Sequence, residues 1–345
     1  MWEVQGQERA VKALERDLRQ GRLAHAYLLV GPPHVGKGTL ALNLAQAVNC
    51  LAQAEERPCG RCSQCTRIAW GRHADIQVIT LERGEEVPRK EIGIDVVREV
   101  QQMAFLKPYE GQHRVFIFDG AEELSEEAAN CLLKTLEEPP PQVLLVLLTA
   151  QEERLLPTLR SRCRRLELRP VPQALVVEEL MKSHQVEEAQ AHRLARLSRG
   201  CLGWAIQAAH NPESLEWHQT EGERILALLE SSLEERFGYA TKLASTFSRN
   251  RHEGREVLYL WLRWWRDLLL LQEGLEELVE HPECLESLRR HAAHYTPGQV
   301  MTFLRRVEAT LAALDDNANA RLALEALLLS LPERHEGEAA VRSRG

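Results

Sequence analysis

Residues 28–39 read LLVGPPHVGKGT, and this stretch predicts the fold of the chain. An apolar run at 26–30 leads into the glycine-rich loop, and the helix-forming run LALNLAQAV follows the loop. This is the order of a phosphate-binding P-loop, in which successive backbone N–H groups and the positive end of a helix converge on a phosphate. Gly31, Gly36 and Lys37 stand where that mechanism requires them. The stretch therefore predicts a site able to hold ATP or ADP.

Two positions depart from the pattern of a site that hydrolyses nucleotide. The residue after the lysine ordinarily gives a hydroxyl to Mg²⁺, but here it is Gly38, and the nearest hydroxyl is that of Thr39. Asp119 ends the apolar run VFIF, where P-loop proteins place a carboxylate for Mg²⁺; alone, it could equally be a turn cap. A glutamate ordinarily comes next, whereas this chain has Gly120, and Glu122 comes too late to take its place. We expect nucleotide binding with very slow or no hydrolysis.

A cluster of cysteines predicts a metal site. Cys50, Cys59, Cys62 and Cys65 have the spacing C-x8-C-x2-C-x2-C, and the other cysteines of the chain are scattered singly. Two overlapping C-x2-C steps bring thiolates together from a tight turn, and the first cysteine completes a tetrahedron. The alternative is four unrelated thiols. Because four protein ligands leave no open position, we expect Zn²⁺ with a structural role.

Two further residues are candidates for roles at a nucleotide site. Thr149 ends the apolar run 143–149, where a hydroxyl either senses the γ-phosphate or satisfies local backbone groups. Arg162 lies in LLPTLRSRC, at the end of a short predicted helix. An arginine placed in this way can reach a nucleotide bound to a neighbouring subunit, where its planar charged group stabilises phosphoryl transfer.

Composition limits the class of protein. The formal net charge of −8 argues against a chain that coats nucleic acid by itself. The richest apolar stretch, residues 257–271, contains Arg263, Arg266 and Asp267, so no membrane span is expected. The start MWEVQGQERAVK lacks an apolar signal core, which predicts a cytoplasmic protein. Up to Pro170 predicted strands alternate with helices, which favours an α/β fold with a parallel sheet flanked by helices; beyond it only helices are expected.

Several longer motifs resemble the AAA+ clamp-loader family of bacterial DNA polymerase III. They cover mainly the first half of the chain and comprise GRLAHAYLLVGP (21–32), IGIDVVREV (92–100), AANCLLKTLEEPPP (128–141), LLPTLRSRC (155–163) and the four cysteines. The combination of LKTLEEPP, an apolar strand and SRC is highly specific.

The resemblance implies a division of the chain into domains. An AAA+ P-loop domain at 1–170 carries the zinc module at 50–65, and a small helical lid follows at 171–210. An all-α collar domain at 211–331 joins the subunits of a pentamer, and 332–345 is a disordered tail.

The resemblance also implies roles. The chain would help to open a sliding clamp and load it onto primed DNA, reached through the assembly, with gamma/tau and delta subunits as partners. Arg162 matches the arginine finger that completes a neighbour's ATP site, and Gly31, Gly36, Lys37 and Thr39 match the P-loop. Trp204 stands where the family's motor subunits have an arginine that touches the γ-phosphate, in a lid segment where we expect helix breaks at Gly200 and Gly203. Together with Gly38 and Gly120, this third loss predicts a subunit that has abandoned hydrolysis.

Two other readings of the whole chain are an active ATPase of the gamma/tau type and a zinc-dependent nucleic-acid-binding protein. Two stretches have open interpretations as well. The aromatic residues of 257–271 are expected in a core or interface, with base stacking as the alternative. Lys107, His113 and Arg114 in KPYEGQHRVF are either a solvated loop or a basic patch for DNA phosphates.

Overall fold

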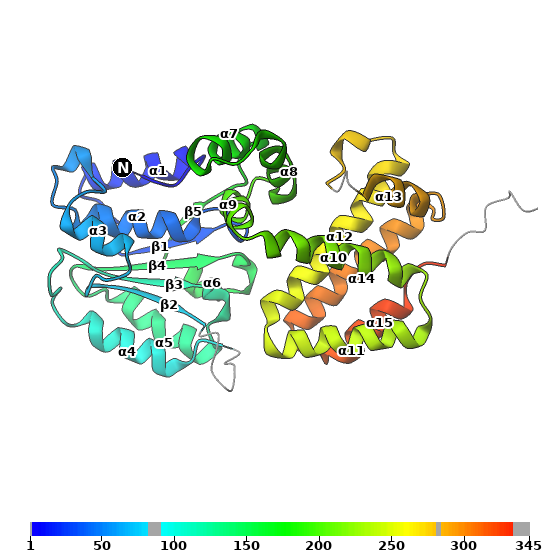
Figure 1. The fold of residues 1–345 in the computed structure, drawn as a ribbon. Coiled ribbons are helices and arrows are strands. Elements are labelled where there is room, and N and C mark those ends of the chain that lie inside the picture. Colours follow the sequence, from blue (N-terminus) through cyan, green and yellow to red (C-terminus); the bar gives the residue numbers. More distant parts are fainter. Residues whose placement is uncertain (1, 82–90, 281–283, 334–345) are drawn as a thin grey trace, which may run out of the picture. The chain divides into compact units, whose positions relative to one another are not determined.

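The computed structural model describes residues 2–81, 91–280 and 284–333. The chain divides into two compact units, Met1–Ala209 and His210–Gly345, and each is described by itself (Figure 1). Three features that the sequence predicts lie outside the described residues: a charged loop at 84–89 (GEEVPR), a turn or helix start at Pro282, and nearly all of the tail at 332–345.

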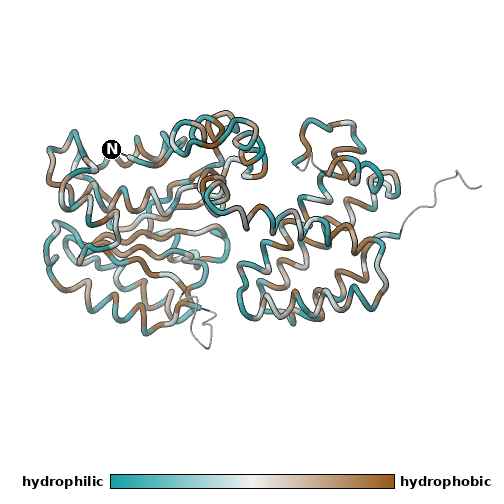
Figure 2. Tube along the Cα trace, in the orientation of Figure 1, coloured by the Kyte–Doolittle hydropathy of each residue, from teal (hydrophilic) through white to brown (hydrophobic). Residues whose placement is uncertain are grey.

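The first unit contains one parallel sheet of five strands, in the order β2-β3-β4-β1-β5. The strands are β1 (Ala26–Val30), β2 (Ile76–Thr80), β3 (Arg114–Asp119), β4 (Val143–Thr149) and β5 (Arg164–Glu167). All seven residues of β4 are buried, and in Figure 2 the central strands are mostly hydrophobic. The predicted α/β fold with a parallel sheet is confirmed.

Helices cover both faces of this sheet (Figure 1). One face packs on α1 (Glu8–Arg19), α2 (Lys37–Asn49) and α3 (Ser63–Ala69), and the other on α4 (Ile94–Ala104), α5 (Glu126–Glu137) and α6 (Pro157–Arg160). Successive strand residues point to opposite faces, so Leu28 belongs to one core and Leu29 to the other. Three short 3-10 turns complete this part: η1 (Ala54–Glu56), η2 (Ala121–Glu123) and η3 (Glu152–Arg154).

Three helices follow β5: α7 (Gln173–His184), α8 (Glu188–Ser198) and α9 (Leu202–His210). Gly200 separates the last two with a φ of +80°, a left-handed conformation that favours glycine, as predicted for a break. The break predicted at Gly203 is wrong, because this residue lies inside α9. A Cβ there would lie 2.8 Å from the carbonyl oxygen of His34, so the glycine serves close packing.

The second unit is helical throughout its described residues. It contains α10 (Pro212–Leu229), α11 (Leu233–Arg249), α12 (Arg251–Gln272), η4 (Glu276–Leu278), α13 (Leu285–Ala292), α14 (Pro297–Asp315) and α15 (Ala320–Leu329). Trp261, Trp264 and Trp265 are at most 2% exposed, so the expectation that they pack in a core is confirmed and base stacking is excluded for them. Among the described residues, no helix is long and apolar enough to cross a membrane.

Candidate nucleotide site and candidate metal centre

The sheet brings the predicted nucleotide-binding residues to one edge. All five strands are parallel, so the P-loop after β1, Asp119 at the end of β3 and Thr149 at the end of β4 lie at the carboxyl edge. The register pairs Val30 with Thr149, and Asp119 with Leu148. The Gly31 N–H also donates to the Thr149 carbonyl at 3.2 Å. Three sequence segments far apart in the chain therefore meet beside the P-loop.

Glycines at two P-loop positions have local reasons. A Cβ at Gly31 would lie 2.5 Å from the Leu168 carbonyl oxygen, so no side chain fits there. Gly36 precedes α2 with a φ of +105°, which is strained for other residues. This backbone aims the start of α2 at the loop, which is the arrangement that binds phosphate.

Lys37 is drawn into the loop that precedes it. Its Nζ donates to the carbonyls of Gly31 at 2.6 Å and Pro32 at 2.8 Å, and the side chain is largely buried. Burial lowers the pKa of Lys37 below its usual value, while the carboxylates of Glu122 and Asp119 act in the opposite direction. The lysine therefore lies among the groups that a bound phosphate would meet.

The two residues after the lysine differ in what surrounds them. A Cβ built on Gly38 has no heavy atom within 4 Å, so nothing steric forbids a side chain at this position. Thr39 is exposed on the first turn of α2. The missing hydroxyl at position 38 is thus a difference in sequence without a packing cause.

The strand end at Asp119 has a different character. Gly120 follows with φ +86° and ψ +52°, and the short turn η2 places Glu122 over the carboxyl edge. Glu122 accepts a hydrogen bond from the Ala150 N–H at 3.1 Å through Oε1, and its Oε2 is buried without a partner among the described residues. Sequence spacing alone missed Glu122 as a neighbour of Lys37, and the left-handed glycine after a strand was the available signal.

Thr149 is fully buried, and its Oγ1 accepts a hydrogen bond from the Gln151 N–H at 3.0 Å. This hydrogen bond is the one expected if Thr149 satisfies local backbone groups. Its position at the end of β4 beside the P-loop is the one expected if Thr149 senses the γ-phosphate, so both interpretations stay open.

Helix α9 packs directly on the P-loop. His34 has a φ of +59°, and its carbonyl accepts a hydrogen bond from the Gly203 N–H at 2.9 Å. Trp204, which we expect to replace a lid arginine, is therefore next to a residue in contact with the loop. Cys201 lies near enough to Lys37 to affect the pKa of that lysine. Neither His34 nor Cys201 was predicted as part of the site.

Arg162 follows the short helix α6, as predicted. Its guanidinium donates to Glu137 Oε1 at 2.6 Å and to the Thr158 carbonyl at 2.9 Å, and the side chain is 35% exposed. The structure therefore holds this arginine at the surface, in an ion pair with the end of α5.

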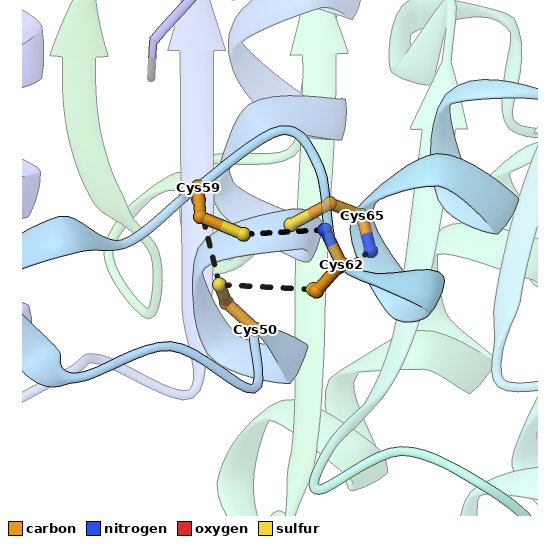
Figure 3. A group of neighbouring side chains, drawn as sticks. All are labelled: Cys50, Cys59, Cys62 and Cys65. Atoms are coloured by element: carbon orange, nitrogen blue, oxygen red, sulfur yellow. Dashed lines mark hydrogen bonds between the residues drawn. The ribbon is translucent and has the colours of Figure 1, made fainter.

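The four predicted cysteines converge in one cluster (Figure 3). The Sγ atoms of Cys50, Cys59, Cys62 and Cys65 all lie within 4.8 Å of one another, and those of Cys50 and Cys62 are 4.0 Å apart. A Zn–S bond of about 2.3 Å gives tetrahedral S···S distances of roughly 3.8 Å. The cluster can therefore hold a metal ion with four thiolate ligands and little rearrangement.

Backbone N–H groups support the charge of these sulfurs. The N–H groups of Ala52 and Cys59 donate to Cys50 Sγ at 3.5 and 3.4 Å, and that of Cys62 donates to Cys59 Sγ at 3.4 Å. Although burial opposes it, donation from Arg61 and Cys62 lowers the pKa of Cys59 to about 6. Thiolate is the form that binds metal, so the donors favour that form.

The proposed basic patch in the loop before β3 turns out to be largely structural. Arg114 forms an ion pair with the buried Asp75 at 3.1 Å, and burial lowers the pKa of His113. Asp75 also accepts the backbone N–H groups of residues 109–111. Of the three predicted basic residues only Lys107 is exposed, whereas His113 and Arg114 are partly buried, so the three do not form one exposed basic patch.

Comparisons with known proteins agree across both units. The family profile described as "DNA polymerase III, delta subunit" matches residues 6–172, and "DNA polymerase III, delta subunit, C terminal" matches 224–333. A DNA polymerase III subunit gamma/tau from Mycobacterium tuberculosis strain H37Rv is 28% identical over 99% of this chain and 63% of its own length.

Two delta′ proteins are also similar to this chain. DNA polymerase III subunit delta′ from Pseudomonas aeruginosa is 38% identical, but over 51% of this chain and 53% of that protein. DNA polymerase III subunit delta′ from Bacillus subtilis is 30% identical over 95% of this chain and 96% of that protein. Because this match spans nearly all of both proteins, the chain belongs to the DNA polymerase III subunit delta′ family.

Proposed function

We propose that the chain is a clamp-loader subunit that hydrolyses little or no nucleotide itself and supplies Arg162 to the ATP site of a neighbouring subunit. Its proposed partners are gamma/tau and delta subunits and a sliding clamp, and it meets primed DNA through the assembly. Membership in the delta′ family supports this role. The observation that carries the loss of hydrolysis is the left-handed Gly120 directly after Asp119.

Gly120 is the most informative departure, because the glutamate expected there is missing and the left-handed backbone at this position disfavours any non-glycine residue. A glutamate at this position would adopt φ +86°, and its Cβ would lie 3.0 Å from Glu123 Oε2. A left-handed backbone costs a non-glycine residue about 1–2 kcal/mol. Groups aimed at transition-state charge are each worth factors of about 10² to 10³ in rate. The proposed site can therefore bind ATP or ADP through Gly31 and Lys37 and still turn it over very slowly.

Two cofactors belong to this proposal. Zn²⁺ would be held by Cys50, Cys59, Cys62 and Cys65 in a structural role, since all four ligand positions come from the chain. ATP or ADP would lie with its phosphates over the start of α2, where Lys37 would exchange its two loop carbonyls for phosphate oxygens.

The arginine finger requires Arg162 to change partners. In the isolated chain the guanidinium pairs with Glu137, and both side chains are well exposed, which makes the pair weak. A phosphate that develops charge in a neighbour's site is a stronger partner because it accepts two parallel hydrogen bonds. Arg162 would therefore leave Glu137 when the neighbouring subunit docks with ATP.

Reconstitution with gamma/tau, delta, clamp and primed DNA tests the finger. We expect Arg162→Ala to lower the DNA-stimulated ATPase rate at the served site by about 10³ to 10⁵. Arg165→Ala is the matched control, because Arg165 is also surface-exposed and paired, with Glu152 and Glu167. An unchanged rate for Arg162→Ala in an assembly of normal composition would refute the role.

The gamma/tau relative that spans nearly the whole chain supports a second candidate, an active ATPase of that type. An ATPase assay on the isolated chain with Mg²⁺ and primed DNA separates the two. The first proposal predicts no DNA-stimulated turnover, and the second predicts turnover that Lys37→Ala abolishes.

A further inference from the structure

The segment 3–7 lies between three parts of the first unit. The backbone N–H groups of Glu3 and Val4 donate to Asn43 Oδ1 at 2.7 and 3.3 Å. Val4 Cγ2 also lies 3.1 Å from the position that a Cβ would take on Gly36, inside the P-loop. This segment therefore contacts α2 and the P-loop at the same time.

Two buried amides continue the contact along α2. Asn43 Nδ2 donates to Gln46 Oε1 at 3.0 Å, and Gln46 Nε2 donates to the carbonyl of Cys65 at 3.0 Å. The two amides are one helical turn apart and only 1% and 2% exposed. An unbroken chain of hydrogen bonds thus runs from the four-cysteine cluster to the segment beside the P-loop.

The other end of the segment is bound just as closely. Gln7 Nε2 donates to the Arg169 carbonyl at 2.7 Å, and Gln7 Oε1 accepts the Arg169 N–H at 3.2 Å. Gly6 has a φ of +68°, and a Cβ there would clash with Val171 at 2.3 Å. The segment is therefore fixed at both ends, and Asn43 is the side chain that holds it near the P-loop.

Burial makes this chain of amides act as a unit. Asn43 and Gln46 each donate one hydrogen bond and accept at least one within this chain of amides. Removal of either side chain therefore leaves its partners with buried, unpaired groups. Apolar residues at 43 and 46 would leave the backbone N–H groups of Glu3 and Val4 and the Cys65 carbonyl without these partners. The two buried amides therefore connect the cysteine cluster with segment 3–7.

We propose that Gln46 and Asn43 are positioning residues that couple the four-cysteine module to the P-loop. When the cysteines close around an ion, the Cys65 carbonyl is fixed, and the amides then hold Glu3 and Val4 against Gly36. Metal binding by the four-cysteine module thereby lowers the mobility of segment 3–7, which packs against the P-loop, and raises the affinity of the P-loop for nucleotide. This inference rests on the proposed zinc site, and its test separates the two.

Hydrogen–deuterium exchange on the full chain tests the coupling. We expect zinc removal to speed exchange of residues 2–7 by about 10- to 100-fold, the range for losing a buried hydrogen-bond partner. Gln46→Met is close in size and breaks the middle link, so in this variant residues 2–7 exchange rapidly with zinc bound and gain nothing from its removal. Binding of a fluorescent ADP analogue should weaken on zinc removal in the natural chain and not in Gln46→Met.

Asn49→Ala is the matched control. Asn49 lies on the same helix, is 1% exposed, and accepts the N–H groups of Gln112 and His113 at 2.7 and 2.8 Å. Its loss should speed exchange near residue 112 and leave the zinc response of residues 2–7 intact. A Gln46→Met variant in which zinc removal still speeds the exchange of residues 2–7 overturns the coupling. So does a natural chain in which zinc removal speeds exchange in β3 as much as in residues 2–7.

Zinc content is measured first, by release into a chromogenic chelator. A natural chain that binds no zinc overturns the metal assignment. A chain that binds zinc but whose residues 2–7 exchange at the same rate after zinc removal overturns the coupling and leaves the metal assignment standing.

Discussion

Gly38→Ser would return the missing hydroxyl to the P-loop. A Cβ at Gly38 meets no heavy atom within 4 Å, and the residue is the second of α2. Serine is also a better helix former than glycine by roughly 0.5 kcal/mol. We therefore expect a variant that folds and is at least as stable as the natural chain.

The effect should appear in nucleotide binding and not in turnover. A hydroxyl that replaces a water on Mg²⁺ contributes about 1 kcal/mol, which is roughly fivefold in affinity at 25 °C. Hydrolysis should stay absent, because Gly120 still follows Asp119 with φ +86° and Trp204 still occupies the lid position.

Titration with a fluorescent ADP analogue, in Mg²⁺ and in chelator, measures this. The fivefold gain should appear only with Mg²⁺. Gly238→Ser is the matched control, because Gly238 also lies in a helix, α11, with no heavy atom near its Cβ position. Equal gains with and without Mg²⁺, or a gain in Gly238→Ser, would refute the reasoning.

Three further predictions follow from the same geometry. Gly120→Glu should lower the free energy of unfolding by about 1–2 kcal/mol in urea titrations, from its left-handed backbone, and should restore no ATPase. Glu137→Gln frees Arg162 from an exposed ion pair of about 0.2–1 kcal/mol, so the ATPase of a reconstituted assembly should rise by up to roughly fivefold, and a fall would contradict the change of partners. Burial lowers the pKa of both His73 and His113 below the usual 6.5. The unfolded chain then takes up these protons first, so the urea midpoint should fall as pH drops from 7.5 to 5.5, and less so after His73→Gln with His113→Gln.

The pattern of apolar residues, together with turn and helix-capping residues, was sufficient to predict much of the fold. The runs at 26–30 and 143–149 are the strands β1 and β4 with the predicted bounds, because a continuous apolar run between turn signals has few alternatives in a sheet buried on both faces. Ser125 caps α5 by accepting the Ala128 N–H at 3.1 Å, as its place before two glutamates indicates. The cysteine spacing likewise predicted a cluster, because short C-x2-C steps leave the thiols little choice of direction.

Tertiary contacts explain what the sequence left undetermined. Gly203 was interpreted as a helix break, but its missing Cβ admits the His34 carbonyl, and that contact is made with a residue far away in the chain. Glu122 lies near enough to raise the pKa of the P-loop lysine because the chain turns at Gly120, and spacing from Asp119 does not reveal this. Arg114 counts as basic in a sequence, yet Asp75 takes up its charge in the structure.

The departures at the candidate nucleotide site are of two physical kinds. The environment of Lys37 bears on nucleotide binding alone and not on hydrolysis. The Cβ position of Gly38 meets no neighbouring atom, so one substitution reverses that change, whereas Gly120 has a left-handed backbone. The proposed loss of hydrolysis is therefore tied to the fold at Gly120. Burial lowers the pKa of Lys37, which means that the fold disfavours the ammonium it encloses. Two loop carbonyls and two nearby carboxylates do not offset that cost fully. A phosphate over the start of α2 would supply the missing compensation, which supports the proposal that this P-loop binds nucleotide.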